Sequence, residues 1–194
     1  MRLGLILALG LCALPAGAQA GIWDGVSTTY KRPETPAATL TEAQRAAVSR
    51  VLREPGEFGG WECSKDEVDA VIKDAQYEWI PVTDRQDVLL VESGAGCARG
   101  GQGANGAMWL IWMKGASAAL IASPKDGFNG WLYSVQSPGS HGMREVVLGW
   151  HMGAREAGLS YFRFDGKRYK PAGSASLVSG EDGLGKIVPN AATK

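Results

Sequence analysis

The sequence predicts an α+β fold, in which two N-terminal helices pack on an antiparallel β-meander of about six or seven strands. Apolar residues recur at helical spacing between residues 40 and 76. From Asp87 onward, short runs of β-forming residues alternate with glycine-containing turns. Those turns are too short for the crossover connections that parallel strands require, so we expect the strands to be antiparallel.

The first twenty residues have the composition of a secretory signal peptide. Arg2 precedes a run of about a dozen apolar residues, and Ala18-Gln19-Ala20 offers a small-x-small cleavage site. The run is shorter than the roughly 20 residues that a bilayer span requires, so we expect removal rather than retention as an anchor. The mature chain is expected to start near Gly21, to lack a membrane span and to be periplasmic or secreted.

The rest of the chain divides into an extended arm at residues 21–38, one α+β domain at residues 39–173 and a tail at residues 174–194. The arm contains Trp23 and two prolines and has no periodicity. The tail is rich in Gly, Ser and Ala and has no amphipathic pattern. We therefore expect the tail to be loosely ordered.

Charge argues against nucleic acid and against an anionic membrane surface as partners. Without Arg2, 19 basic side chains face 20 acidic ones, which leaves no basic surplus for phosphate contacts. The expected partner is a protein or another component of the cell envelope, and no cofactor is expected.

The mature chain keeps two cysteines, Cys63 and Cys97, because Cys12 leaves with the signal peptide. In an oxidising compartment two cysteines most simply form one disulfide. Closing about 35 residues would stabilise the fold by roughly 3–4 kcal/mol in the chain-entropy model. The alternative is a pair of free thiols, one of which acts as a nucleophile.

Two helices are expected before the strands. The first has a capping box formed by Thr41 and Gln44, and Pro55 with the following glycine ends it. The second runs to about residue 76 and has its own capping box at Ser64 and Glu67. A disulfide at the preceding cysteine would anchor the start of this second helix.

Runs rich in β-forming residues predict the strands. They are expected at residues 77–80, 87–92, 107–114, 118–122, 131–135, 145–150 and 159–164, and a further run at residues 167–169 follows the last of these. Trp109 and Trp112 lie three apart in one strand, so they must face opposite sides of the sheet. Asp165-Gly166 predicts a two-residue type I′ hairpin turn, because both central residues of that turn need φ > 0.

The segment Tyr161-Phe-Arg-Phe-Asp-Gly-Lys-Arg-Tyr169 resembles the closing strands of small secreted bacterial proteins. It is also similar to single blades of FG-GAP-type β-propeller repeats. The chain departs from the propeller pattern at Asp84-Arg-Gln-Asp87, where two acids replace an Asp-rich calcium loop. The resemblance covers about half of the chain and implies no catalytic residue.

The glycine-rich loop from Ser93 to Gly106 is the first candidate for recognition, and the turn from Ser137 to Gly142 is the second. A GxGxxG string occurs in the loop, but a strand begins where a phosphate-binding helix would start, so nucleotide binding is not expected. The segment Ser93–Gly96 is similar in kind to the Ser-Gly loops with which exported lysozyme inhibitors enter an active site. The expected binding residues are Ser93, Gly94, Arg99, Gln102, Asn105, His141 and His151.

The sequence predicts neither a metal site nor a catalytic residue. His141 and His151 are the two histidines of the chain, and without free cysteines they fall short of a zinc ligand set. Ser137 or Ser140 with Asp165 and a histidine can be imagined as a hydrolase triad. However, no G-x-S-x-G nucleophile elbow occurs.

The favoured function is therefore an exported, non-enzymatic binding or inhibitor-like module that recognises a protein or envelope partner through glycine-rich loops. Two alternatives stay open. One is an exported hydrolase that acts on cell-wall or carbohydrate substrates with His141 or His151 and a nearby acid. The other is a carbohydrate-binding module, for which the seven tryptophans supply candidate stacking surfaces.

Overall fold

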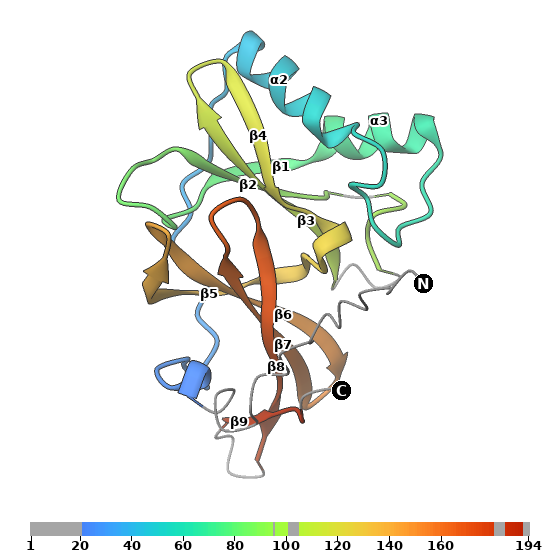
Figure 1. Ribbon diagram of the computed structural model, residues 1–194. Coiled ribbons are helices and arrows are strands. Elements are labelled where there is room, and N and C mark those ends of the chain that lie inside the picture. The colour runs from blue at the N-terminus through green and yellow to red at the C-terminus, as the bar shows by residue number, and fades with distance from the viewer. Residues whose placement is uncertain (1–20, 95, 101–104, 181–184, 192–194) are drawn as a thin grey trace, which may run out of the picture.

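The computed structural model describes residues 21–94, 96–100, 105–180 and 185–191. Within these ranges the chain forms two α-helices and an antiparallel sheet of nine strands (Figure 1). The α+β class is confirmed, but the expected count of six or seven strands is too low. The expected signal peptide at residues 1–20 lies outside the described residues.

The elements have the following bounds. The helices are η1 Gly21–Trp23, α2 Glu42–Leu52, α3 Lys65–Asp74 and η2 Pro124–Asp126. The strands are β1 Gln76–Trp79, β2 Val88–Glu92, β3 Gly106–Lys114, β4 Ser117–Ala122, β5 Asn129–Ser140, β6 Met143–Gly153, β7 Glu156–Phe164, β8 Tyr169–Ser179 and β9 Gly185–Pro189.

The sheet consists of two parts that meet at a narrow join. Strands β1 to β4 form the first half-sheet, and strands β5 to β9 form the second half-sheet. Between them, β3 pairs with β5 at Gly106↔Gly130 and Ala107↔Asn129. In Figure 1 the first half-sheet lies above the second, and the helices α2 and α3 lie at the top.

Both α-helices begin at the capping boxes that the sequence predicts. The Thr41 hydroxyl accepts from the Gln44 backbone N–H at 3.3 Å, and the Gln44 side chain accepts from the Thr41 N–H at 3.0 Å. Ser64 and Glu67 repeat this arrangement at the start of α3. Each box pairs two N–H groups that a helix start otherwise leaves without an intrahelical partner.

Three apolar cores hold the layers together. The helix-side core joins the helices to one face of the first half-sheet through Trp109 and Leu89, and the central core joins the two half-sheets through Leu90, Phe128 and Phe162. Leu89 and Leu90 face opposite cores because neighbouring side chains of a strand alternate between faces. Trp109 and Trp112 divide in the same way between the helix-side and central cores.

The arm forms the third core, the arm-side core, on the face of the second half-sheet opposite the central core. Trp23 and Val26 are buried there, and the Trp23 ring contacts the Tyr161 ring edge-on at 5.5 Å between centroids. From this position, near the bottom of Figure 1, the chain runs upward to the helices. On the way, Ala38 donates its backbone N–H to the Tyr77 carbonyl at 2.8 Å, so the arm spans both half-sheets.

The expectation of a loosely ordered tail is wrong for residues 174–179 and 185–189. The first group completes β8, and the second is β9, which pairs with β8 from Ala175↔Pro189 to Ser179↔Gly185. Strand pairing depends on backbone hydrogen bonds, which need no apolar pattern in the sequence. Leu177 and Ile187 pack against the arm-side core, so apolar contact is limited to a few positions.

The turn at Asp165 is also longer than expected. Phe164 pairs directly with Tyr169, which leaves four residues in the loop instead of two. The Asp165 carboxylate accepts the backbone N–H groups of Lys167 at 2.8 Å and Arg168 at 2.7 Å. This hydrogen bonding of an Asp side chain to the backbone shortly after it stabilises the wider turn, in which Gly166 has φ +98°.

Among the described residues, no helix has both the length and the apolar character that a membrane crossing would need.

Candidate functional site

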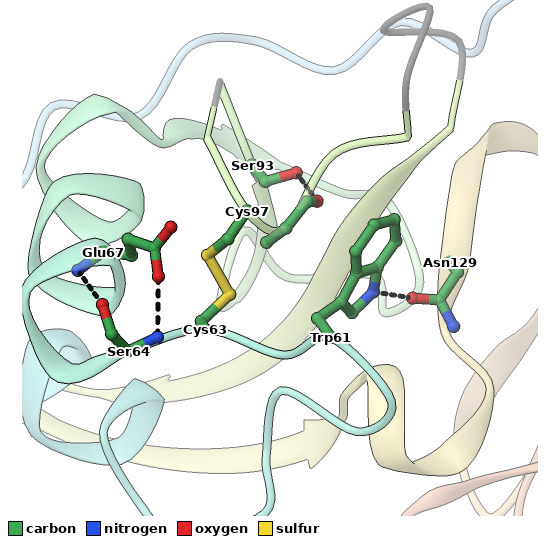
Figure 2. The surroundings of a disulfide bond; sticks show 8 residues. Trp61, Cys63, Ser64, Glu67, Ser93, Cys97 and Asn129 are labelled. Atoms are coloured by element: carbon green, nitrogen blue, oxygen red, sulfur yellow. Dashed lines mark hydrogen bonds between the residues drawn. A yellow bond between two sulfur atoms is a disulfide. The ribbon is translucent and has the colours of Figure 1, made fainter.

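The glycine-rich loop is tied to the helix layer by a disulfide between Cys63 and Cys97, as the sequence predicts. Figure 2 shows that this bond lies beside the capping box of α3. On the other side of the bond, the Trp61 indole N–H donates to the Asn129 side chain at 2.8 Å. The loop is therefore attached both to the start of a helix and, through Trp61, to the second half-sheet.

Ser93 and Gly94 are part of the scaffold and do not form an exposed tip. Ser93 is 4% exposed, and its hydroxyl donates to the Ala98 carbonyl at 2.8 Å (Figure 2). Gly94 lies so close to the end of α3 that a Cβ there would be 2.2 Å from the Asp74 carbonyl oxygen. The comparison with the Ser-Gly loops of lysozyme inhibitors is therefore not supported at these two residues.

Arg99 and Asn105 lie on the side of the loop that meets the second half-sheet. The Arg99 guanidinium donates to the backbone carbonyls of Ser93 at 3.2 Å and Gly94 at 2.6 Å. The Asn105 side chain accepts from the His151 N–H at 2.8 Å and donates to the His151 carbonyl at 3.4 Å. The structure thus brings Asn105 into contact with His151, another expected site residue. Gln102 lies outside the described residues.

The two histidines lie at opposite ends of β6. His141 is in the β5–β6 turn, with φ +50°, whereas His151 is close to the last residue of the strand. Ten residues at the usual rise of a strand separate them by about 33 Å. They therefore belong to different surfaces. His151 lies with Asn105 and Arg99, which we call the loop group, and His141 lies apart from them in the β5–β6 turn.

Ser140, His141 and Asp165, the members of the conceivable hydrolase triad, lie close together. However, the serine hydroxyl and the carboxylate both form hydrogen bonds to the backbone. His141 lies against the β7–β8 turn: its Nδ1 atom is 3.5 Å from the position that a Cβ at Gly166 would occupy. The Ser140 hydroxyl donates to the Phe164 carbonyl at 2.6 Å, and the Asp165 carboxylate accepts two backbone N–H groups. The Ser140 bond joins the two turns, and the Asp165 bonds stabilise the second turn from within. Neither set of bonds supports a catalytic role.

The sequence did not indicate the exposed apolar residues next to the loop group. Trp150 is 49% exposed, although Leu148, two residues before it on the same strand face, is buried in the central core. Register places Trp150, Gly158, Ser176 and Val188 side by side across β6, β7, β8 and β9. We call this row, with the exposed Val178 two residues after Ser176, the open face.

Trp150 is held in place by the glycine beside it. A Cβ at Gly158 would be 1.4 Å from the Trp150 Nε1 atom, so the indole lies over the bare glycine backbone. Met152, also exposed, follows at the β-bulge between His151 and Gly153. An aromatic ring, a thioether and the loop group therefore share one end of the second half-sheet.

A small cavity of about 140 Å³ lies between the loop and the join of the half-sheets. Its lining includes Arg32, Glu92, Arg99 and Trp131. Arg32 donates to Glu92 at 3.1 Å and to Glu78 at 2.8 Å. Burial raises the pKa of Glu92 above its usual value, and the Arg32 charge offsets this only in part. These charges are paired within the protein and support the base of the loop.

A larger cleft of about 470 Å³ lies where the arm meets the end of β5. Glu145, which is 7% exposed, lines it. Its carboxylate accepts from the Tyr161 hydroxyl and from Arg163 Nε, both at 2.5 Å. Burial, together with the bond to Glu145, raises the pKa of Tyr161, so the phenol stays protonated at neutral pH. The predicted turn from Ser137 to Gly142 is shorter in the structure, because Ser137 to Ser140 belong to β5. The end of this strand is one wall of a cleft that contains a buried carboxylate.

A second buried charged cluster lies around Arg168. Its guanidinium donates to Asp126 at 2.6 Å, and to Glu57 and the Ser123 hydroxyl at 3.0 Å. Lys125 pairs with Glu57 at 2.5 Å. The cluster joins the loop after α2, η2 and the start of β8, and its groups bind one another. In the part of the chain that the structure describes, no group of three or more His, Cys, Asp or Glu side chains is placed to hold a metal ion.

Comparisons with protein-family models, curated proteins and solved structures return no match to this chain. The resemblance of the segment 161–169 to small secreted bacterial proteins therefore stays a prediction.

Proposed function

We propose that the protein is an exported, non-enzymatic module that binds a protein of the cell envelope. Its contact surface, which we call the recognition surface, consists of Arg99, Asn105, Trp150, His151 and Met152. The observation that carries the proposal is the half-exposed Trp150, held over Gly158 beside a loop that is tied down at both ends.

The composition of the recognition surface suits protein binding. Trp, Met and Arg are enriched at protein interfaces, and Trp and Arg are prominent among the residues whose truncation costs most affinity. The adjoining Val178 and Val188 extend the exposed apolar area along the open face. A patch of this kind, next to polar side chains, is typical of interaction sites on soluble domains.

Rigidity of the recognition surface also favours binding. The Cys63–Cys97 disulfide holds one side of the loop, and the two Asn105–His151 hydrogen bonds hold the other. A surface that is already ordered loses less conformational entropy when a partner binds. The disulfide supports the expected location in the periplasm or outside the cell, because disulfides persist in oxidising compartments.

Affinity capture tests this proposal. The mature protein, immobilised through its C-terminus, is incubated with envelope extract from the source cells, in parallel with a W150A variant and a Y30A control. Tyr30 is another exposed aromatic residue, at 45%, but it contacts Tyr133 in the arm-side core. We expect one specific protein to be retained by the native chain and by Y30A, and at least tenfold less by W150A. Equal retention by all three chains would contradict the assignment.

The placement of Trp150 also favours a second candidate, a carbohydrate-binding module. An indole that rests on a glycine backbone and is open to solvent on one side offers a flat apolar surface to a sugar ring. Addition of cell-wall oligosaccharides should then shift the Trp emission of the native chain but not of W150A. Unchanged emission at millimolar sugar concentrations would exclude the carbohydrate-binding module and favour the protein-binding module.

A further inference from the structure

The cleft at Glu145 has hydrogen-bonding capacity that the described contacts do not use. Each carboxylate oxygen of Glu145 accepts one hydrogen bond, from Tyr161 or from Arg163, and an ionised carboxylate offers about four acceptor positions. Glu145 is nearly fully buried, yet it lines an open cleft. A ligand in the cleft can therefore reach acceptor positions on a carboxylate shielded from bulk water.

The walls of the cleft add further acceptors. Asp24 and Ser140 also line it, and the Ser140 hydroxyl, whose hydrogen goes to the Phe164 carbonyl, keeps acceptor capacity on its oxygen. The charged side chains in the lining are Asp24, Glu145 and Arg163, which together carry one negative charge. The chemical group that suits such a site has a positive charge and several N–H donors, as a primary ammonium group has.

Gly21 also lines this cleft, and it is firmly attached to the body of the protein. Two residues later, Trp23 packs edge-on against Tyr161, which donates to Glu145. Ile22 packs so closely on β8 that a Cβ at Gly173 would be 2.5 Å from its Cδ1 atom. Side chains packed on the sheet thus hold residue 21 at the wall of the cleft that Glu145 also lines.

We propose that the cleft is a binding site for a primary ammonium group, and that its occupant is the α-ammonium group of Gly21. That group forms when a signal peptidase hydrolyses the peptide bond between Ala20 and Gly21. The reaction consumes one water molecule, leaves a carboxylate on Ala20 and an amine on Gly21, and the amine takes up a proton. The inference rests on the predicted removal of residues 1–20 and is independent of the recognition surface.

This pairing would couple processing to stability. The unprocessed chain has an uncharged peptide nitrogen at Gly21, whereas the processed chain places an ammonium group beside Glu145 and Asp24. Hydrogen bonds to charged groups contribute more to stability than those between neutral groups. The mature protein should therefore be more stable than a chain whose residue 21 is acylated, even when the acyl group is small.

A double-mutant cycle tests the proposal. The chain beginning at Gly21 is prepared with a free and with an acetylated amino terminus, each with Glu145 and with E145Q, and unfolding in urea is measured at pH 7. Acetylation should lower the folding equilibrium constant about tenfold with Glu145 present and less than twofold in E145Q. An equal loss in both backgrounds would show a steric effect and would overturn the proposal, as would no loss. D24N provides the second background if E145Q does not fold.

The pH dependence gives an independent readout. An α-amino group ordinarily titrates near pH 7.7–8.0. Glu145 and Asp24 favour its charged form, Arg163 opposes it, and the Tyr161 phenol is neutral, so the pKa should rise in the folded state. The extra stability of the free-amine chain is then fully present below about pH 7.7 and is lost as the pH rises through the raised pKa. The acetylated chain should lack this loss. Sequencing of the exported protein that finds another first residue would also overturn the proposal.

Discussion

Arg168 lies among buried carboxylates, and this position decides what its removal should cost. Its guanidinium bonds Glu57 and Asp126, both of which have nearly buried side chains. Removing one partner from a buried charged cluster leaves the other charges uncompensated, at a cost of about 3–5 kcal/mol. We expect R168A to lose about 3 kcal/mol in urea unfolding, because Lys125 and Lys170 stay in place. K167A, at an exposed neighbour, is the control, and an equal effect of both variants would contradict the account.

The same cluster predicts how stability changes at low pH. Burial by itself would raise the pKa of Glu57, but hydrogen bonds from Lys125, Ser123 and Arg168 outweigh it and hold the pKa below its usual value. The pKa of Asp126 is likewise lowered by Lys170 and Arg168 against the effect of burial. A depressed pKa contributes stability above the unfolded-state value, near pH 4, and loses it as the pH falls through the folded-state value.

We therefore expect the free energy of unfolding to decrease as the pH is lowered below about 4. Urea midpoints measured between pH 7 and pH 2.5 should show this decrease. The slope should be smaller in D126N, which has one titrating carboxyl fewer. A D126N slope as steep as that of the native chain would assign the acid sensitivity to other groups.

At the recognition surface, Gly158 determines where the Trp150 ring can lie. A G158A substitution places a methyl group inside the present position of the ring, so the indole must move. We expect a loss of about 1–3 kcal/mol, typical of overpacking, together with a shift of Trp emission. Gly153 supplies the matched control, since a Cβ there meets no atom within 4 Å. G153A should leave both measurements nearly unchanged.

At the scale of single elements, the disulfide joins the start of α3 to the loop before β3. It closes a segment with a sequence separation of 34 residues. Chain-entropy arguments give about 3–4 kcal/mol for a segment of this length. We expect the C63A/C97A variant to lose an amount in that range, measured as a lower urea midpoint. Reductant should destabilise the native chain and leave the variant unaffected, which separates loss of the bond from loss of thiol packing.

Helix starts were predictable from sequence because their signals are local. Thr41 with Gln44, and Ser64 with Glu67, pair through side chains three residues apart, so the residues themselves define the boundary. The disulfide followed from the cysteine count. The sequence did not predict β9. This edge strand is held by backbone hydrogen bonds to β8 and buries few side chains, so it has little hydrophobic periodicity.

The candidate site was predictable only in part, for a similar reason. Arg99, Asn105 and His151 were named from composition, and the structure brings Asn105 and His151 into contact. The burial of Ser93 and the exposure of Trp150 depend on packing between segments distant in sequence. No local pattern distinguishes an exposed tryptophan at the end of a strand from the buried one in β3.

At the scale of the molecule, both half-sheets contribute to the central core. Phe128, which is fully buried, contacts Phe162 at 4.9 Å and Tyr169 at 6.4 Å between ring centroids. We expect F128A to cost about 3–5 kcal/mol. Because the two half-sheets share this core, they should unfold together. Far-UV and near-UV circular dichroism should therefore report the same single transition for the native chain, and likewise for F128A. Two separated transitions would show that the half-sheets fold independently.

The narrow join between β3 and β5 makes the segment before β5 a natural place to divide the polypeptide. A fragment ending near Gly127 would retain the arm, the helices and β1 to β4, and its complement would begin with β5. Neither fragment covers its own apolar surface, and Trp23 of the first belongs against Tyr161 of the second. Two such fragments, each fused to half of a reporter enzyme, would reassemble into the native shape and restore the reporter signal.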